Sequence, residues 1–198
     1  MRNVTTTVFA VSVLMLGART TSAQETPTFH RGQWAAEFSG GAGLSAGLLR
    51  FYSPTSALAI SFGGNISRQY SESNTGPDLE NSHGYLSVAI GVRRHTSVAP
   101  RVVAWNELGV VGTVLHDRSE YNDLSGTAVE SRRSGFSGSG YGEIGGQYFV
   151  TSHIALGAAA TLYAGGNWSS DRTGTSRGRS HGFALSTGLT PIMFTLYF

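Results

Sequence analysis

Apolar and polar residues alternate with a period of two along most of the chain, which is the pattern of β-strands with two different faces. At the first such segment Trp34, Ala36 and Phe38 alternate with Ala35 and Glu37. Eight segments of this kind occur, at residues 33–41, 43–52, 57–69, 85–95, 101–116, 137–150, 154–168 and 182–198. In the last segment the alternation changes phase, which predicts a β-bulge near residues 188–191.

The connections between these segments alternate in length. Short turns are predicted at 53–56, 96–100 and 151–153, and long polar loops at 71–84, 117–134 and 169–181. The first connection on the long-loop side, near 40–44, is short. Tilted strands of this length can cross a bilayer, but only a closed barrel pairs all their backbone groups there.

We therefore predict an all-β fold, an eight-stranded antiparallel up-and-down transmembrane β-barrel with long loops exposed on one side. A soluble, exported, lipocalin-like binding barrel is the alternative architecture. It would require the apolar faces to point inward and the polar faces outward, so the two architectures differ in which face meets the surroundings.

The first residues have the features of an export signal. Arg2 precedes an apolar run at 8–18, and small residues at 21–23 suit cleavage. The predicted organisation is a signal peptide at 1–23, a short N-terminal lead at 24–32 and an outer-membrane barrel domain at 33–198. The predicted location is the bacterial outer membrane.

The composition agrees with a membrane barrel. Charged residues make up 13% of the chain, against about 25% in soluble domains, and glycine is frequent at 27 residues. The chain has no cysteine, which excludes thiolate chemistry and disulfides, and all fourteen basic residues are arginine. Two of these arginines lie in the predicted signal peptide, so twelve remain against twelve acidic residues, and no nucleic-acid partner is expected.

If the apolar faces point to lipid, charged residues within the strands point into the barrel. Burying an unpaired charge is costly, so we expect these residues to pair. Glu37 is expected to meet Arg50 on the neighbouring strand, and Arg93 to be shared between Glu107 and Glu143. Five tyrosines are predicted to crowd the same lumen, namely Tyr52, Tyr85, Tyr141, Tyr163 and Tyr197. We expect a lumen closed by side chains, with a narrow pore as the alternative.

Two further groups of residues are candidates for contact with the membrane. Trp34, Tyr148 and Trp168 are predicted interfacial aromatic anchors. Arginine forks suit phosphate recognition, so arginines near the long loops are candidates for lipopolysaccharide contacts. These are Arg68, Arg118, Arg172 and Arg177.

Motifs for catalysis are weak. Ser and His lie close together at 95–97 and at 180–181, so an outer-membrane lipid-modifying enzyme stays an alternative, but no catalytic residue, metal site or cofactor is predicted. Residues 140–145 (GYGEIG) match a dinucleotide-binding pattern. That pattern needs a strand before it and a helix after it, whereas strand-like sequence continues to 150, so we assign the stretch to the sixth strand.

The signal peptide, the eight alternating segments and the C-terminal residues 194–198 (FTLYF) together resemble the OmpA/OmpX-type small outer-membrane β-barrels. The resemblance covers nearly the whole chain after the signal peptide. It implies that Phe194, Leu196 and Phe198 form a β-signal for the barrel assembly machinery, although Met193 stands where that signal usually has glycine. It also implies a structural or surface-interacting role, with lipid as partner and an unknown surface ligand.

Overall fold

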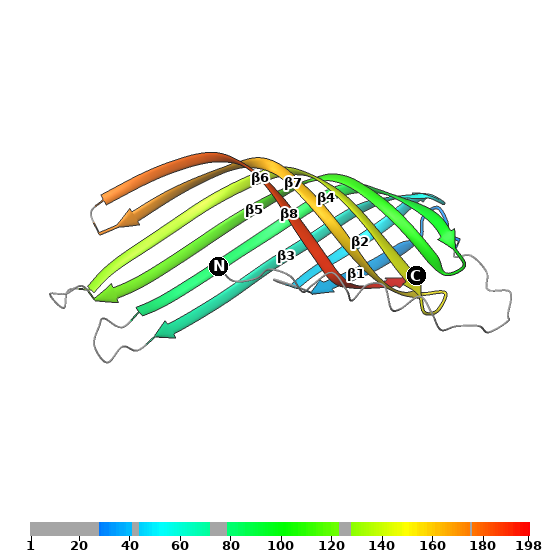
Figure 1. Ribbon diagram of the computed structural model, residues 1–198, viewed down its shortest axis with the longest axis horizontal. Helices are drawn as coiled ribbons and strands as arrows, with labels where there is room; N and C mark the ends of the chain where they lie inside the picture. The colour runs from blue at the N-terminus through cyan, green and yellow to red at the C-terminus, as the bar shows by residue number, and fades with distance from the viewer. Residues whose placement is uncertain (1–27, 41–43, 72–78, 123–127, 175) are drawn as a thin grey trace, which may run out of the picture.

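Eight strands form a closed barrel in which each strand is antiparallel to the next and β8 closes on β1 (Figure 1). The computed structural model describes residues 28–40, 44–71, 79–122, 128–174 and 176–198. The strands are β1 (Trp34–Gly40), β2 (Leu44–Ser53), β3 (Ser56–Ser71), β4 (Leu79–Ala99), β5 (Val102–Asn122), β6 (Ala128–Phe149), β7 (Ile154–Thr173) and β8 (Ser176–Tyr197). The predicted fold class is confirmed.

Some predicted features fall on other parts of the chain. The signal peptide at 1–23, residues 24–27 of the lead and the centres of the predicted loops lie outside the described residues. Among the residues that the structure does describe, no helix is long and apolar enough to cross a membrane.

The prediction of long loops at 71–84, 117–134 and 169–181 is wrong, because most of the described residues in these ranges belong to strands. The pairing of β5 with β6 runs from Val102↔Tyr148 to Asn122↔Ala128, and that of β7 with β8 reaches Thr173↔Ser176. Beyond a membrane both faces of a hairpin meet water, so the polar alternation disappears while the backbone ladder continues. The predicted loops are tall β-hairpins, and we call this end the long-hairpin rim (Figure 1).

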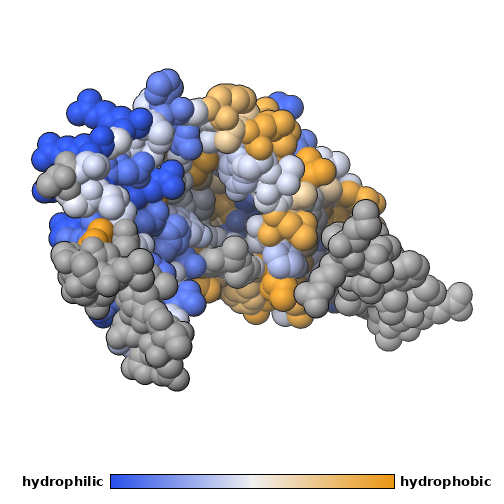
Figure 2. All heavy atoms as spheres, turned by 60° about the vertical axis from the view of Figure 1, so that its left-hand side comes forward, coloured by the Kyte–Doolittle hydropathy of each residue, from blue (hydrophilic) through white to orange (hydrophobic). Residues whose placement is uncertain are grey.

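The outward face is apolar and the inward face is polar or small over most of the barrel wall. On β4, Leu86, Val88, Ile90 and Val92 point outward and are exposed, while Arg93 is buried in the lumen. Hydrophilic residues gather at the long-hairpin rim and hydrophobic ones over the wall behind it (Figure 2). This polarity is that of a barrel in lipid, and it contradicts the lipocalin-like alternative.

The change in the phase of alternation within the last strand corresponds to a shift in the register between β7 and β8. Gly157 lies opposite Met193, whereas Ala159 lies opposite Thr190, so β8 carries one residue more than β7 across this step. Leu189 and Ile192 therefore both point outward and are exposed. The expected bulge is confirmed.

The barrel wall has uneven height. β1 pairs with β8 only from Ile192 to Tyr197, and β2 pairs with β3 only as far as Gly64. The longer parts of β3 to β8 continue as a six-stranded sheet past the short β1–β2 hairpin. We call the place where the described strand pairing is lowest, at Gly40 and Leu44 between β8 and β3, the notch.

The end opposite the long hairpins, which we call the short-turn rim, is filled by an aromatic layer. Phe29 of the N-terminal lead enters the lumen there and stacks on Phe51 with ring centroids 4.5 Å apart. Gly32, with φ of 90°, turns the chain and donates from its N to the carbonyl of Phe51 over 2.7 Å. The buried apolar residues of the layer are Phe29, Ala35, Leu49, Phe51, Ala57, Ala59, Val103, Phe149, Ala155 and Tyr197.

Candidate functional site

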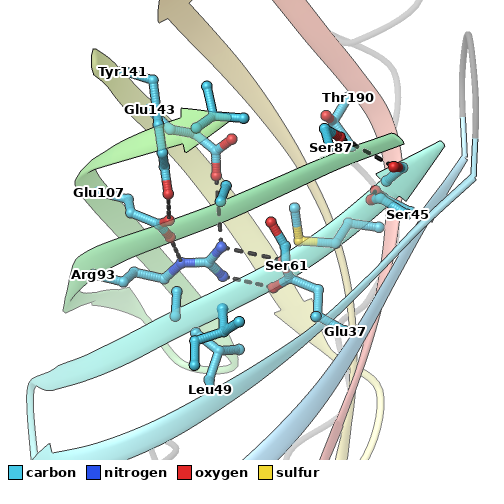
Figure 3. Close-up of a pocket in the computed structure, with 18 of the residues that line it drawn as sticks. Glu37, Ser45, Leu49, Ser61, Ser87, Arg93, Glu107, Tyr141, Glu143 and Thr190 are labelled. Atoms are coloured by element: carbon cyan, nitrogen blue, oxygen red, sulfur yellow. Dashed lines mark hydrogen bonds and ion pairs between the residues drawn. The ribbon is translucent and has the colours of Figure 1, made fainter. Parts of the chain in front are cut away.

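A buried ion cluster lies in the lumen directly above the aromatic layer, centred on Arg93 of β4. The Arg93 Nε donates to Oε2 of Glu107 on β5 over 2.6 Å. Its two terminal nitrogens donate to the two carboxylate oxygens of Glu37 on β1, over 2.6 and 3.2 Å. The third acid, Glu143 of β6, lies 3.6 Å from the guanidinium. One arginine thus faces three carboxylates from three other strands (Figure 3).

The carboxylates have further donors from the barrel wall. Tyr141 donates its hydroxyl to Glu107, and Thr161 of β7 donates to Oε2 of Glu143 over 2.8 Å. The indole nitrogen of Trp105 donates to Oε1 of Glu143 over 3.3 Å. Because each carboxylate oxygen accepts at least one hydrogen bond or ion pair, the cluster offsets the desolvation that burial imposes on its charges.

The prediction that Arg50 lies in the lumen is wrong. Arg50 is opposite Trp34 in the β1–β2 register, and its guanidinium lies over the Trp34 ring on the outer face, 5.3 Å from the ring centroid. Tyr52, on the same face of β2, is exposed as well. The inward positions of β2 are instead Leu49 and Phe51, because this strand supplies the aromatic layer. An apolar inward face makes the direction of such a strand ambiguous in the sequence.

The GYGEIG stretch is strand throughout, as predicted, and Gly145 in it makes room for Trp105. A Cβ on Gly145 would lie 2.2 Å from Cζ2 of Trp105, which is buried. The Trp105 ring in turn lies under the guanidinium of Arg93, 4.9 Å from the ring centroid to Cζ. Gly145 therefore makes room for the indole of Trp105, which in turn lies under Arg93.

Substitution Gly145→Ala is expected to destabilise the barrel by about 1–3 kcal/mol, because the new methyl group forces the buried Trp105 out of position. The adjacent Gly146→Ala is the matched control, since its Cβ would meet nothing nearer than 4.0 Å. Urea unfolding in phosphatidylcholine vesicles, followed by tryptophan fluorescence, measures both. Equal unfolding midpoints for the two variants would contradict the packing role of Gly145.

Sequence reasoning missed Phe29 as part of the lumen, and it placed Trp105 and Thr161 on inward faces without naming them as partners of the acidic residues. Trp105 and Thr161 share the inward parity of Glu107 and Tyr163, so the alternation held a signal for them. Phe29 had no such signal, because it precedes the first strand. The cluster and the aromatic layer together fill the lumen at the short-turn rim.

The residues considered for catalysis do not come together. His95 is buried against both Phe29 and Phe51, and neither of its ring nitrogens has a hydrogen-bond partner among the described residues. Ser180 shares a hydrogen bond with Ser169 over 2.7 Å, on the inner face near the long-hairpin rim. Within the described ranges, no three His, Asp or Glu side chains gather where they could hold a metal ion.

The four predicted surface arginines form a row together with Arg132. Arg118, Arg132, Arg172 and Arg177 lie directly opposite one another on β5 to β8, and Arg68 continues the row through Ser82 of β4. An acidic row follows on β4 to β6, formed by Glu80, Glu120 and Glu130. The predicted anchors Trp34, Tyr148 and Trp168, and the C-terminal residues Phe194, Leu196 and Phe198, point outward and are exposed.

The acidic row neutralises only part of the arginine row. Arg68 pairs with Glu80, Arg118 with Glu120 and Glu130, and Arg132 with Glu130. The hydrogen bond from Arg132 and the charge of Arg118 hold the pKa of Glu130 below its usual value. In the part of the chain that the structure describes, Arg172 and Arg177 have no acidic partner.

The architecture matches solved structures over most of its length. A major outer membrane protein from Thermus thermophilus superposes with a TM-score of 0.59 at 10% identity, over 85% of this chain and 100% of that one. The fold is that of a small outer-membrane β-barrel. Acinetobacter baumannii CarO aligns with a TM-score of 0.48 at 9% identity, over 85% of this chain and 98% of that one. Ail, the attachment invasion locus protein of Yersinia pestis, aligns with a TM-score of 0.41 at 12% identity, over 85% of this chain and 100% of that one.

Neither a protein-family model nor a curated protein sequence matches the chain. The superposition on the Thermus thermophilus barrel confirms the resemblance to OmpA/OmpX-type barrels at the level of the fold. Together with the apolar outward face, the fold places this small outer-membrane barrel in a bacterial outer membrane.

Proposed function

We propose that this outer-membrane barrel is a non-catalytic protein of the cell envelope with a closed lumen. Its short-turn rim faces the periplasm and its tall hairpins stand on the outside. The ion cluster and the aromatic layer serve to close and stabilise the barrel. The absence of ion conductance in planar bilayers is the expected result, and a steady conductance would favour the narrow pore instead.

We further propose that the arginine row binds phosphates of lipopolysaccharide. The observation that carries this is the cross-strand position of Arg172 and Arg177, which face each other directly and form no ion pair with an acidic residue in the described ranges. Like charges in this position are destabilising, so an anion bound between them relieves the repulsion. The guanidinium forks match phosphate oxygens, and the outward-facing Trp168 lies nearer the apolar wall on the same face of β7.

The double substitution Arg172→Gln with Arg177→Gln is expected to weaken lipopolysaccharide binding roughly tenfold, because two charge-assisted contacts are lost. Binding is measured by titrating lipopolysaccharide into barrel-containing nanodiscs. Arg94→Gln, which removes an exposed arginine near the other rim, is the control and should leave binding unchanged.

Two further binding measurements distinguish phosphate recognition from nonspecific electrostatic attraction. Dephosphorylated lipopolysaccharide should bind wild type and double variant alike, and added salt should weaken only the phosphate-dependent part. If Arg94→Gln weakens binding as much as the double variant does, the arginine row is not the site.

A further inference from the structure

The pairing of the described residues in the barrel wall ends lowest at the notch. A strand needs about 9–11 residues to cross a bilayer when tilted. β1 has 7 residues, and its pairing with β8 ends at Gly40↔Ile192. The residue Leu189, beyond that point on β8, still points outward and is exposed, as lipid-facing residues are. The described pairing of β1 therefore ends below the outer surface of the membrane, whereas β2, with 10 residues, has a crossing length.

An apolar groove lies on the outer side of the notch. It has a volume of about 550 Å³ and runs over the end of the β1–β2 hairpin. Its large side chains are Phe38, Leu44, Phe62, Leu86, Ile192 and Phe194. A groove of this character takes an alkyl chain, since burying methylene groups there costs no hydrogen bonds.

A polar cavity of about 170 Å³ lies on the inner side of the notch, above the ion cluster. Hydroxyl groups line its wall, from Ser39, Ser45, Ser61 and Ser87 (Figure 3). Glu37, Arg93, Glu107 and Glu143 form its floor. Ser39, Ser45 and Gly63 border both the cavity and the groove, so the two spaces are adjacent at the hairpin end.

The charges of the cavity select the head group of a ligand. Three carboxyl groups face one guanidinium, so the floor holds an excess of acidic over basic groups. In a confined site with little water this excess attracts a cation and repels a phosphate, sulfate or carboxylate. The serine oxygens accept hydrogen bonds, which a primary ammonium group can donate.

We propose that the notch is a binding site for single-chain amphiphiles with a cationic head, with the alkyl chain in the groove and the ammonium group in the cavity. The site goes beyond the proposed function. It depends on the barrel fold and the short β1–β2 hairpin, and neither on lipopolysaccharide binding nor on the absence of conductance.

Gly63 offers a way to narrow the border between groove and cavity without breaking the barrel. A Cβ at Gly63 would lie 2.9 Å from the Ser87 hydroxyl, a side-chain atom that can rotate away. Gly63→Val therefore adds bulk between groove and cavity at a strand position that tolerates β-branching. Gly138→Val is the matched control, because Gly138 is a strand glycine of β6 whose Cβ would make only ordinary contacts with Phe136.

The test uses the full barrel in phosphatidylcholine nanodiscs, titrated separately with dodecylammonium, dodecanol and dodecyl sulfate. Backbone amide shifts of Ser61, Ser87 and Ala89 report binding in the cavity. We expect saturable shifts with dodecylammonium at an affinity about tenfold or more above that of dodecanol, and weaker binding of dodecyl sulfate. Gly63→Val should weaken dodecylammonium binding several-fold, whereas Gly138→Val should not.

Glu37→Gln supplies a second comparison, because it removes one negative charge while keeping the size of the side chain. It should reduce the preference for dodecylammonium over dodecanol. If that variant fails to fold, two other results decide the question. They are the relative affinities of wild type for the three amphiphiles and the comparison of Gly63→Val with Gly138→Val. Equal binding of dodecylammonium and dodecanol, tighter binding of dodecyl sulfate, or no effect of Gly63→Val would overturn the proposal.

Discussion

Arg93→Ala is expected to lower the free energy of unfolding by about 3–5 kcal/mol. The arginine side chain is 5% exposed, and among the described residues it is the only cation paired with Glu37, Glu107 and Glu143. Its removal leaves three buried carboxylates without a counter-charge. Urea unfolding in phosphatidylcholine vesicles measures the change.

The matched control for Arg93 is its neighbour in sequence. Arg94 follows on β4, points outward and is exposed, so Arg94→Ala should change the free energy of unfolding by less than about 1 kcal/mol. Arg93→Lys should recover only part of the stability, because an ammonium group cannot make the bidentate contact with Glu37. Similar midpoints for Arg93→Ala and Arg94→Ala would show that the cluster does not stabilise the barrel.

Phe29→Ala is expected to destabilise the barrel by about 3–5 kcal/mol, since it empties the centre of the aromatic layer. The Phe29 ring contacts Phe51, His95, Phe149 and Tyr197, at centroid distances between 4.5 and 6.1 Å. No other described residue of the lead is buried. The urea midpoint of the variant in vesicles gives the size of the effect.

Thr28→Ala serves as the control for Phe29, because Thr28 is exposed and adjacent in the chain. It should leave the midpoint unchanged. Amide hydrogen exchange at Phe51 adds a local measurement, as its N donates to the carbonyl of Gln33 over 2.9 Å and loses protection if the lead detaches. If Phe29→Ala and Thr28→Ala unfold at the same urea concentration, the lead is not part of the folded barrel.

The alternation of apolar and polar residues predicted much of the charge cluster. Arg93 and Glu107 stand on strands whose other face is strongly apolar, so their inward direction could be read directly. Glu143 alternates with the outward Ile144 on a strand whose other face is mostly glycine. β2 has apolar residues on both faces, and the charge of Arg50 then suggested the wrong side. The Cα of Arg50 lies opposite that of Trp34, and stacking on the Trp34 ring lets the charged Arg50 side chain stay on the outer face.

The height of the hairpins could not be read from the alternation. Residues such as Ser119 and Ser131 are opposite each other in β5 and β6, yet both faces of this region are polar. In water a strand needs no apolar face, so a polar strand and a polar loop have similar sequences. The same limit hid the arginine row, because residues far apart in the chain become neighbours only through the strand register.

The sequence by itself determined the number and order of the transmembrane strands, the closed barrel and, on every strand except β2, the face that meets lipid. Those features follow from local alternation, because each strand must separate lipid from the lumen along its own length. Only the tertiary structure decided that Arg93 bridges three acids, that Phe29 enters the lumen and that the short first hairpin leaves a notch. These depend on strand register and on contacts between distant segments, which alternation within one strand does not encode.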